Sequence, residues 1–395
     1  MSDGAAPEPL GGERSPQPVG EGLLARWLTP LAADRDVRGL TRRLRPRAAG
    51  EALIDLAGND YLGLSRDPRV VEAAVAAVRE WGAGATASRL VTGTTALHAS
   101  LESALASYTG HEAGLAFSSG YLANLGVVTA LGGPDTLLVS DAHVHASLVD
   151  ACRLSRSRVE IVPHNDVEAV GKALANRNEA HALVLTESVY SVLGDAAPLT
   201  ALAATALEYD AVLLVDEAHG VGVTGHGRGG VAAAGLAGLD HVVVTATLSK
   251  ALASQGGVVL GPAVLREHLV NRARSFIFDT GLNPAACAAA LAALRILIDE
   301  PTRPDSIHAT ARRLAAECGV MPSAGAVVSV PMPGPRETVR AAELCLADGV
   351  RVGSFRPPSV PDGISRLRLT ARAGLSAAEL DHACRTITTA IQEVS

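Results

Sequence analysis

Residues 211–220 read AVLLVDEAHG, and residues 241–250 read HVVVTATLSK. Each segment begins with a short, nearly continuous apolar run, which is typical of a strand buried on both faces of a mainly parallel sheet. Each then turns polar, the first at Asp216 and His219 and the second at Lys250. Because ligands of doubly wound sheets bind at the carboxyl ends of the strands, the two segments predict a sheet edge where an acid, an imidazole and an amine meet.

The same kind of apolar run recurs on both sides of these segments, at AGLAF (113–117), TLLVS (136–140), VEIVP (159–163), ALVLTES (182–188) and GGVVLGP (256–262). Helical stretches separate the runs, and strands alternating with helices over more than 200 residues predict an α/β domain with a doubly wound, mainly parallel sheet. A long Ala-rich helix is expected from Pro284. Beyond residue 301, fewer and more alternating strands predict a smaller α+β domain, with strands at AVVSVPM (326–332), GVRVGSF (349–355) and SRLRLTA (365–371).

Proline and glycine positions divide the chain further. The first residues carry four prolines among glycines and no apolar core of a secretion signal, which predicts a disordered extension over 1–22. A helical arm is expected over 23–55, broken near Pro30 and stopped by Pro46. The large domain is then expected over 56–290 and the small C-terminal domain over 291–395.

Composition excludes several classes of protein. The chain has 395 residues, of which 48% are hydrophobic and 19% charged, with a net charge of −7. It is large enough for an extensive core, and neither global disorder nor a basic nucleic-acid footprint is indicated. No apolar stretch is long enough to span a membrane. The five cysteines are widely spaced, which argues against a disulfide framework and fits a reducing cytoplasm.

Only two of the 34 basic side chains are lysines, Lys172 and Lys250. Arginine stays protonated near neutral pH, so only a lysine can form a covalent link to an aldehyde or act as a base. Lys172 lies in a polar helical stretch, VEAVGKALANRNE, which predicts a solvated position. Lys250 follows a buried strand, with Asp216 and His219 expected nearby.

This combination of side chains indicates pyridoxal 5′-phosphate (PLP), which needs three supports. Lys250 suits its aldehyde, Asp216 its pyridinium nitrogen, and His219 the O3′ oxygen. For the phosphate, Ser118-Ser119-Gly120-Tyr121 lies between a strand and a helix, where backbone N–H groups favour anions. The hydroxyl of Thr247 is a further candidate.

Three further motifs suggest other ligands. His143-Val144-His145 has the spacing of a metal pair, but no third and fourth ligands accompany it, so the alternative is that a histidine stacks on a flat cofactor ring; no metal is expected. Residues 225–230 match G-x-G-x-x-G, yet the preceding strand ends too early and no acid follows at the proper distance, which favours a flexible glycine loop. A phosphate-binding Walker loop is also absent, because Lys172 is followed by Ala173.

Seven motifs resemble, in their order along the chain, those of the α-oxoamine synthases: NDYLGL (59–64), SRLVTG (88–93), FSSGYLAN (117–124), HASL (145–148), VDEAHG (215–220), TLSK (247–250) and RPPSVP (356–361). The resemblance implies an aspartate-aminotransferase-like fold (fold type I), PLP as cofactor, and a homodimer with its active site at the subunit interface. It implies condensation of an amino acid with an acyl thioester and loss of CO2. The sequence is most similar to actinobacterial members that join L-alanine to a pimeloyl thioester, of CoA or acyl carrier protein, in biotin biosynthesis.

The resemblance also implies roles for single residues. Lys250 binds the cofactor aldehyde and acts as the base, and His145 stacks on the pyridine ring. Further cofactor contacts are implied for Asp216 (ring nitrogen), His219 and Ser191 (O3′), Gly120, Tyr121 and Thr247 (phosphate), and Thr280 from the neighbouring subunit (phosphate). Substrate contacts are implied for Arg368 and Asn59 (carboxylate) and for Arg42 and Ser359 (acyl substrate).

Two departures from the family pattern stand out: Val192-Leu193 lacks the acid that commonly precedes the following glycine, and Asp279 stands where a serine is frequent. Both bear on the acyl pocket and the phosphate cup. The alternatives left open are a 2-amino-3-ketobutyrate CoA ligase, which uses glycine and acetyl-CoA, a PLP aminotransferase or lyase, and a non-catalytic binding protein.

Overall fold

The computed structural model describes residues 22–395, so the predicted extension over 1–22 lies outside the described residues apart from Gly22. Contacts divide the chain into two compact units, Met1–Glu51 and Ala52–Ser395. The described part of the first unit contains one helix, α1 (Leu23–Val37). Among residues 22–395, none of the helices combines the length and apolar character that crossing a membrane requires.

The predicted break at Pro30 is wrong, because α1 continues through this residue. Proline fixes φ near the helical value and removes one backbone donor, so a helix can continue at the cost of one hydrogen bond. The helix ends at Val37, well before Pro46. Gly39 adopts a φ of 66°, and Leu40 N donates to the Arg35 carbonyl over 2.8 Å; a left-handed glycine with such a bond terminates helices.

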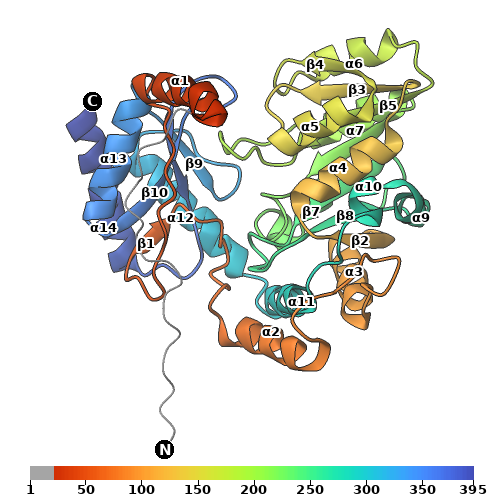
Figure 1. Cartoon of the computed structure of the whole chain (residues 1–395), viewed down its shortest axis with the longest axis horizontal. Helices are drawn as coiled ribbons and strands as arrows, with labels where there is room; N and C mark the ends of the chain where they lie inside the picture. The colour runs from red at the N-terminus through yellow and green to blue at the C-terminus, as the bar shows by residue number, and fades with distance from the viewer. Residues whose placement is uncertain (1–21) are drawn as a thin grey trace, which may run out of the picture. The chain divides into compact units, whose positions relative to one another are not determined.

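A seven-stranded sheet lies in the second unit (Figure 1). Its strands, in the spatial order of the sheet, are β2 (Ala113–Phe117), β8 (Gly257–Gly261), β7 (Val242–Thr247), β6 (Val212–Asp216), β5 (His181–Glu187), β3 (Thr136–Asp141) and β4 (Arg158–Val162). All neighbours pair in parallel except β8, which runs antiparallel to both β7 and β2. The prediction of a mainly parallel sheet in an α/β domain is confirmed.

Helices cover both faces of this sheet. The apolar side chains of one face pack with α4 (Gly120–Leu131), α5 (Ala146–Ser155), α9 (Ala263–Arg272) and α10 (Arg274–Ile277). Those of the other face pack with α2 (Pro68–Trp81), α3 (Ala96–Thr109), α6 (Val167–Ala175), α7 (Leu199–Glu208), α8 (Gly230–Ala233) and α11 (Pro284–Asp299). Successive residues of β3 show the alternation, since Leu137 and Val139 belong to one cluster and Leu138 to the other. Burial on both faces explains why the strands are almost entirely apolar.

The carboxyl ends of four parallel strands meet at one edge of the sheet. Their last residues are Asp141 (β3), Glu187 (β5), Asp216 (β6) and Thr247 (β7). All four side chains are polar, although the rest of each strand is mostly apolar. Polar groups therefore gather at the edge where a doubly wound sheet binds its ligands.

A second sheet has the order β1-β10-β11-β9. It consists of β1 (Ile54–Leu56), β10 (Val350–Phe355), β11 (Arg366–Thr370) and β9 (Val327–Pro331), and the remaining helices of this part are α12 (Arg303–Glu317), α13 (Pro335–Ala347) and α14 (Ala377–Val394). β1 pairs in parallel with β10, whereas β11 runs antiparallel to both of its neighbours. The expected boundaries at 55/56 and 290/291 fall inside β1 and α11, and the division into domains stays a prediction.

Candidate active site

Lys250 and His219 lie in contact at the carboxyl edge of the large sheet. Lys250 follows β7 and His219 follows β6, two adjacent strands. The Lys250 Nζ atom is 2.8 Å from His219 Nε2, and His219 Nδ1 is 2.6 Å from the hydroxyl of Tyr61. That hydroxyl donates to Asn59 Oδ1 over 3.1 Å. The predicted meeting of an amine and an imidazole is thus present, and it continues into a chain of hydrogen bonds.

Burial sets the charge state of this pair. It lowers the pKa of His219 well below its ordinary value, and the positive charges of Lys250 and Arg368 act in the same direction. A neutral His219 accepts from the Lys250 amine at Nε2 and donates to the Tyr61 oxygen at Nδ1. Burial also lowers the pKa of Lys250 to about 8, although the Asp216 and Glu187 carboxylates raise it. A substantial fraction of this amine is therefore neutral near physiological pH.

Asp216 is held in place by two donors. It ends β6 and is buried, with a relative exposure of 5%. Its Oδ2 atom accepts from Asn124 Nδ2 over 2.7 Å, and its Oδ1 atom accepts from the backbone N–H of Ala218 over 2.9 Å. Asn124 is itself held by Thr245, whose hydroxyl donates to Asn124 Oδ1 over 2.6 Å. This fixed carboxylate can bind a protonated ring nitrogen.

The N-terminus of α4 faces Thr247. Ser119 caps this helix, accepting from Leu122 N over 3.1 Å, and a Cβ atom added at Gly120 would lie 3.1 Å from Thr247 Cβ. Any larger residue at position 120 would crowd the space between helix and strand. The helix N-terminus and the Thr247 hydroxyl together suit a phosphate group.

His145 lies at the N-terminus of α5. Its Nδ1 atom is 2.8 Å from the hydroxyl of Ser147, and it also accepts from the Ser147 backbone N–H over 3.2 Å. Burial lowers the pKa of His145, while the Asp216 charge raises it and the Lys250 charge lowers it. A largely neutral ring held at this position can stack on a flat ligand.

These groups surround one cavity of about 270 Å³. It is lined by Ser119, Gly120, Tyr121, Asn124, His145, Ser147, Glu187, Asp216, Ala218, His219, Thr247, Ser249 and Lys250. The donor set fits PLP on three counts: an amine of lowered pKa, a fixed carboxylate, and a helix N-terminus opened by a glycine. In addition, the buried Oε1 atom of Glu187 has no hydrogen-bond partner among residues 22–395, as expected for an atom that faces a ligand.

Arg368 lies in β11, and its side chain reaches the loop after β5. The Nε atom donates to the carbonyl oxygen of Ser191 over 2.7 Å, and NH1 donates to Asn59 Oδ1 over 3.2 Å and to Thr370 Oγ1 over 3.1 Å. The guanidinium also lies 5.2 Å from the centre of the Phe355 ring. These contacts fix a buried cation whose planar fork suits a carboxylate.

Other predicted site residues lie outside the cavity lining. Thr280 and Ser359 are exposed, and Arg42 belongs to the first unit. Ser191 contacts Arg368 through its backbone. Asp279, the departure from the family pattern, accepts a short hydrogen bond from the Ser118 hydroxyl. The roles assigned to these residues stay predictions.

The sequence reasoning missed three residues of this site: Asn124, Tyr61 and Glu187. Asn124 and Tyr61 lie within two of the family motifs, and Glu187 lies near the end of the run at 182–188. The signal available for Glu187 was a carboxylate that ends an otherwise buried apolar strand. Burial and the Asp216 charge raise its pKa well above the ordinary value, although Lys250 and the backbone N–H groups of His145 and Ser191 act in the opposite direction.

The G-x-G-x-x-G segment is part of the scaffold. It forms a short helix, η1 (Gly225–Gly227), and the start of α8. Glu217 holds it, since its Oε1 atom accepts from Val231 N over 2.6 Å and its Oε2 atom accepts from the Ser188 hydroxyl over 2.6 Å. A side chain at Gly229 would place Cβ 3.0 Å from Glu217 Oε1. Close packing against a buried acid therefore accounts for glycine there.

The chain matches known proteins along most of its length. The family model for aminotransferase class I and II matches residues 51–387. The 8-amino-7-oxononanoate synthase of Mycobacterium sp. (strain JLS) is 58% identical over 363 residues, which are 91% of this chain and 95% of that protein. The enzyme of the same name from Mycobacterium bovis (strain BCG / Pasteur 1173P2) is 57% identical over 364 residues, 92% of this chain and 94% of that protein.

Solved structures show the same fold. A serine palmitoyltransferase from S. paucimobilis with PLP and myriocin bound is 29% identical, with a TM-score of 0.87 over 95% of this chain and 99% of that one. The serine palmitoyltransferase of Sphingomonas wittichii is 30% identical, with a TM-score of 0.87 over 94% and 99% of the two chains. The 8-amino-7-oxononanoate synthase of Francisella tularensis, at 23% identity and a TM-score of 0.73 over 87% and 98%, shows the fold alone.

These similarities confirm the resemblance inferred from the seven motifs and the aspartate-aminotransferase-like fold. The family model covers most of the chain, and the curated relatives share more than half of their aligned residues with it. This protein belongs to the aminotransferase class I and II family.

Proposed function

We propose that this protein is a PLP-dependent acyltransferase that condenses L-alanine with a pimeloyl thioester to give 8-amino-7-oxononanoate, CO2 and the free thiol, a step of biotin biosynthesis. The observation that carries the proposal is the 58% identity to an 8-amino-7-oxononanoate synthase over 91% of the chain. The cavity beside Lys250 supplies the chemical groups that such a reaction needs. The acyl carrier is CoA or acyl carrier protein.

Groups at the sheet edge would hold PLP. Lys250 would bind its aldehyde, Asp216 its ring nitrogen, and the N-terminus of α4 with Thr247 its phosphate. His145 would stack on the ring, and His219 would serve O3′. When bound, the cofactor supplies an electron sink for the negative charge that develops at the amino-acid Cα.

Lys250 moves the proton in this scheme. With a pKa of about 8, its Nζ atom is neutral often enough to take the Cα proton of L-alanine, which is the work of a general base. Asn124 and Ala218 hold the carboxylate of Asp216 in one orientation. Lys250 and Asp216 are thus held by different hydrogen-bond partners.

Arg368 orients the substrate. Its Nε and NH1 atoms are held by the Ser191 carbonyl and by Asn59. The guanidinium can therefore receive the carboxylate of L-alanine without first leaving its place. Asn59 assists it.

The resemblance to the family assigns contacts with the acyl thioester to Arg42 and to Ser359. The active form is a homodimer in which Thr280 of one subunit completes the phosphate site of the other. Support for the second subunit comes from the exposed position of Thr280 outside its own chain's cavity.

The test is turnover with defined substrates. Purified protein is incubated with PLP, L-alanine and pimeloyl-CoA, and CoA, CO2 and 8-amino-7-oxononanoate are measured. We expect the three products in equal amounts and a much lower rate with glycine and acetyl-CoA. Transfer of the amino group without formation of a carbon–carbon bond would contradict the proposal. Replacing CoA by acyl carrier protein in a parallel assay identifies the preferred carrier.

A further inference from the structure

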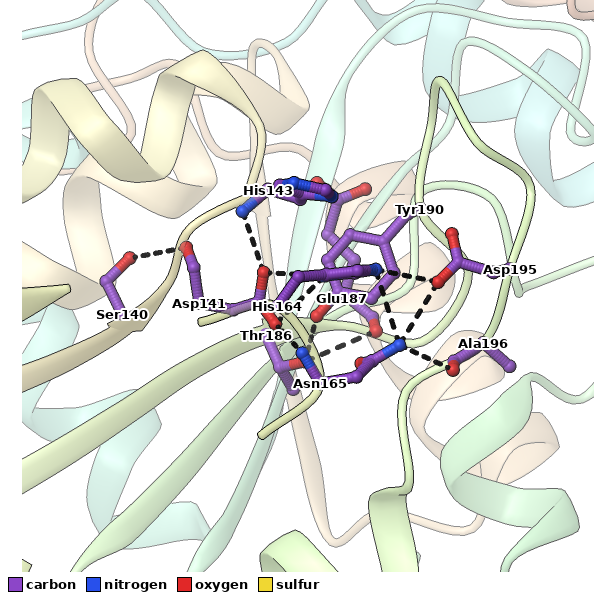
Figure 2. A network of polar contacts seen from close by, with 10 residues as sticks. All are labelled: Ser140, Asp141, His143, His164, Asn165, Thr186, Glu187, Tyr190, Asp195 and Ala196. Carbon is purple, nitrogen blue, oxygen red and sulfur yellow. Dashed lines mark hydrogen bonds and ion pairs between the residues drawn. The ribbon is translucent and has the colours of Figure 1, made fainter. Parts of the chain in front are cut away.

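A second cluster of titratable side chains lies beside the cavity, around His164, which follows β4 (Figure 2). Its Nδ1 atom is 2.9 Å from Asp141 Oδ1, and its Nε2 atom is 2.7 Å from Asp195 Oδ2. Asp141 ends β3, and Asp195 lies in the loop after β5. One imidazole therefore joins segments that follow three different strands.

The carboxylates around His164 have further donors. Asp141 accepts from the backbone N–H of His143 and of Asn165, each over 2.7 Å. Asp195 accepts from Asn165 Nδ2 over 3.1 Å. Among residues 22–395, this cluster is not arranged to hold a metal ion. Hydrogen bonds fix the positions of the side chains in this cluster.

Aromatic contacts hold the ring of His164 between two neighbours. The His143 ring stacks on it with centroids 4.0 Å apart and an angle of 19° between the ring planes, and Tyr190 meets it edge-on at 4.4 Å (Figure 2). The Tyr190 hydroxyl is in turn 2.9 Å from Thr186 Oγ1. The ring can therefore rotate only if these neighbours move.

Two short contacts to carboxylates require two N–H groups, and a neutral imidazole has only one. Burial lowers the pKa of His164, but the hydrogen bonds and charges of Asp141 and Asp195 outweigh it and raise the pKa above the ordinary value. Burial and the His164 charge lower the pKa of His143, while Asp141, Asp195 and Asp362 raise it. The cluster thus holds one imidazolium between two carboxylates, with a largely neutral imidazole stacked on it.

Of the two loops that His164 joins, one carries the cavity residue His145 and the other carries Ser191, a contact of Arg368. His143 is two residues before His145, and Tyr190 is next to Ser191, whose carbonyl accepts from Arg368. Backbone groups of both His145 and Ser191 oppose the rise in the pKa of the Glu187 carboxyl. A displacement of either loop would consequently move the groups that face the cofactor and the substrate.

We propose that His164 is a positioning residue, which ties the β3–α5 loop to the β5–α7 loop through simultaneous hydrogen bonds to Asp141 and Asp195 and so holds His145 at the cavity and Ser191 against Arg368. The proposal of a role in catalysis rests on the proposed function. The tie between the loops does not depend on it.

The tie makes stability depend on pH in a defined direction. Because the folded pKa of His164 is raised above its ordinary value of 6.5, its contribution is fully present below pH 6.5 and is lost as pH rises through the folded pKa. His164→Gln removes this contribution, since a glutamine amide cannot carry the charge. His181→Gln is the matched control, because His181 is an exposed residue at the start of β5.

The first experiment measures the Tm of the three cofactor-free proteins from about pH 6 to about pH 9. We expect His164→Gln to melt about 3 °C below the wild type at the acidic end, with the difference shrinking as pH rises, and His181→Gln to follow the wild type. If the difference in Tm between the wild type and His164→Gln is absent, or is constant across this pH range, His164 does not tie the two loops together in the proposed way. If His164→Gln does not fold, Asp195→Asn replaces it, with the same trend in smaller measure.

The second experiment follows the cofactor. We expect His164→Gln to bind PLP about tenfold more weakly and to give a smaller circular dichroism band of the bound cofactor, because a loosened loop no longer fixes His145. If His164→Gln binds PLP with wild-type affinity and gives an unchanged circular dichroism band, the positioning role is refuted. A wild-type protein that binds PLP but makes no 8-amino-7-oxononanoate would refute the proposed function instead, and the melting experiment would still decide on the tie.

Discussion

The two lysines of the chain lie in opposite surroundings. Lys172 lies on α6 with 70% of its side chain exposed and its Nζ atom 2.6 Å from Glu168 Oε1, and this hydrogen bond raises its pKa. Lys250 lies at the edge of the large sheet beside His219, and burial lowers its pKa to about 8. Position thus turns one side chain into a permanent cation and the other into an amine that can lose its proton.

The two lysines differ in the property that matters: Lys172 contributes a charge, whereas Lys250 contributes a reactive amine. An arginine can replace a surface cation, since only the charge and its solvated contact matter. It cannot replace an amine that binds an aldehyde and then moves a proton. In a chain with 34 basic residues and two lysines, a lysine among polar strand ends therefore indicates chemistry, and a lysine on an exposed helix does not.

The largest expected effect comes from exchanging each lysine for arginine. Lys250→Arg is expected to lower kcat by at least about 1000-fold, because a guanidinium does not become neutral. Lys172→Arg should keep kcat within about twofold, since an exposed ion pair contributes little. Both are measured by product formation from L-alanine and pimeloyl-CoA. Equal losses of kcat in the two variants would contradict the view that only Lys250 takes part in the reaction.

Neutralising the acid near each lysine gives the next effect. Asp216→Asn is expected to lower kcat about 100-fold, because the site loses its fixed negative charge, and to lower the pKa of Lys250 further, since Asp216 raises it. Glu168→Gln removes the partner of Lys172 and serves as the control. Retention of full activity by Asp216→Asn would show that the carboxylate is only structural.

A smaller effect is expected from Arg368→Lys, which keeps the charge and removes the planar fork. We expect KM for L-alanine to rise about tenfold with a smaller change in kcat, because the second oxygen of the carboxylate loses its donor. Arg313→Lys, at an exposed position on α12, provides the control. An unchanged KM would place the substrate carboxylate elsewhere.

The last prediction is a shift along the pH axis. The rate at which the cofactor-free protein captures added PLP should rise with pH to a midpoint near 8, because only the neutral form of Lys250 reacts and its pKa is about 8. The increase in absorbance of bound PLP measures this rate. A midpoint near 10.5, the ordinary lysine value, would show that burial does not tune this amine.

The strands were predictable from the sequence because each apolar run is short, bounded by turn residues and buried on both faces. Predicted and observed limits agree closely, for example 113–117 for AGLAF and Ala113–Phe117 for β2. The helix α2 begins at Pro68, and Asp67 caps it, accepting from Arg69 N over 2.9 Å. The helix break predicted at Pro30 is wrong because a proline can occur inside a helix when a single hydrogen bond is lost.

Part of the site was predictable for the same reason, since Asp216 and Lys250 follow strands directly. Contacts between distant residues were not. Tyr61 meets His219 across 158 positions and Arg368 meets Ser191 across 177, and no local pattern encodes either contact. His164 was likewise invisible, because a histidine after a strand gains its role only through carboxylates from two other loops.

The most direct test locates the cofactor on the chain. The wild-type protein is loaded with PLP, treated with borohydride to make the lysine link permanent, digested, and examined by mass spectrometry. We expect a phosphopyridoxyl group on the peptide that contains Lys250 and none on the peptide that contains Lys172. A label on Lys172, or equal labelling of the two peptides, would contradict it.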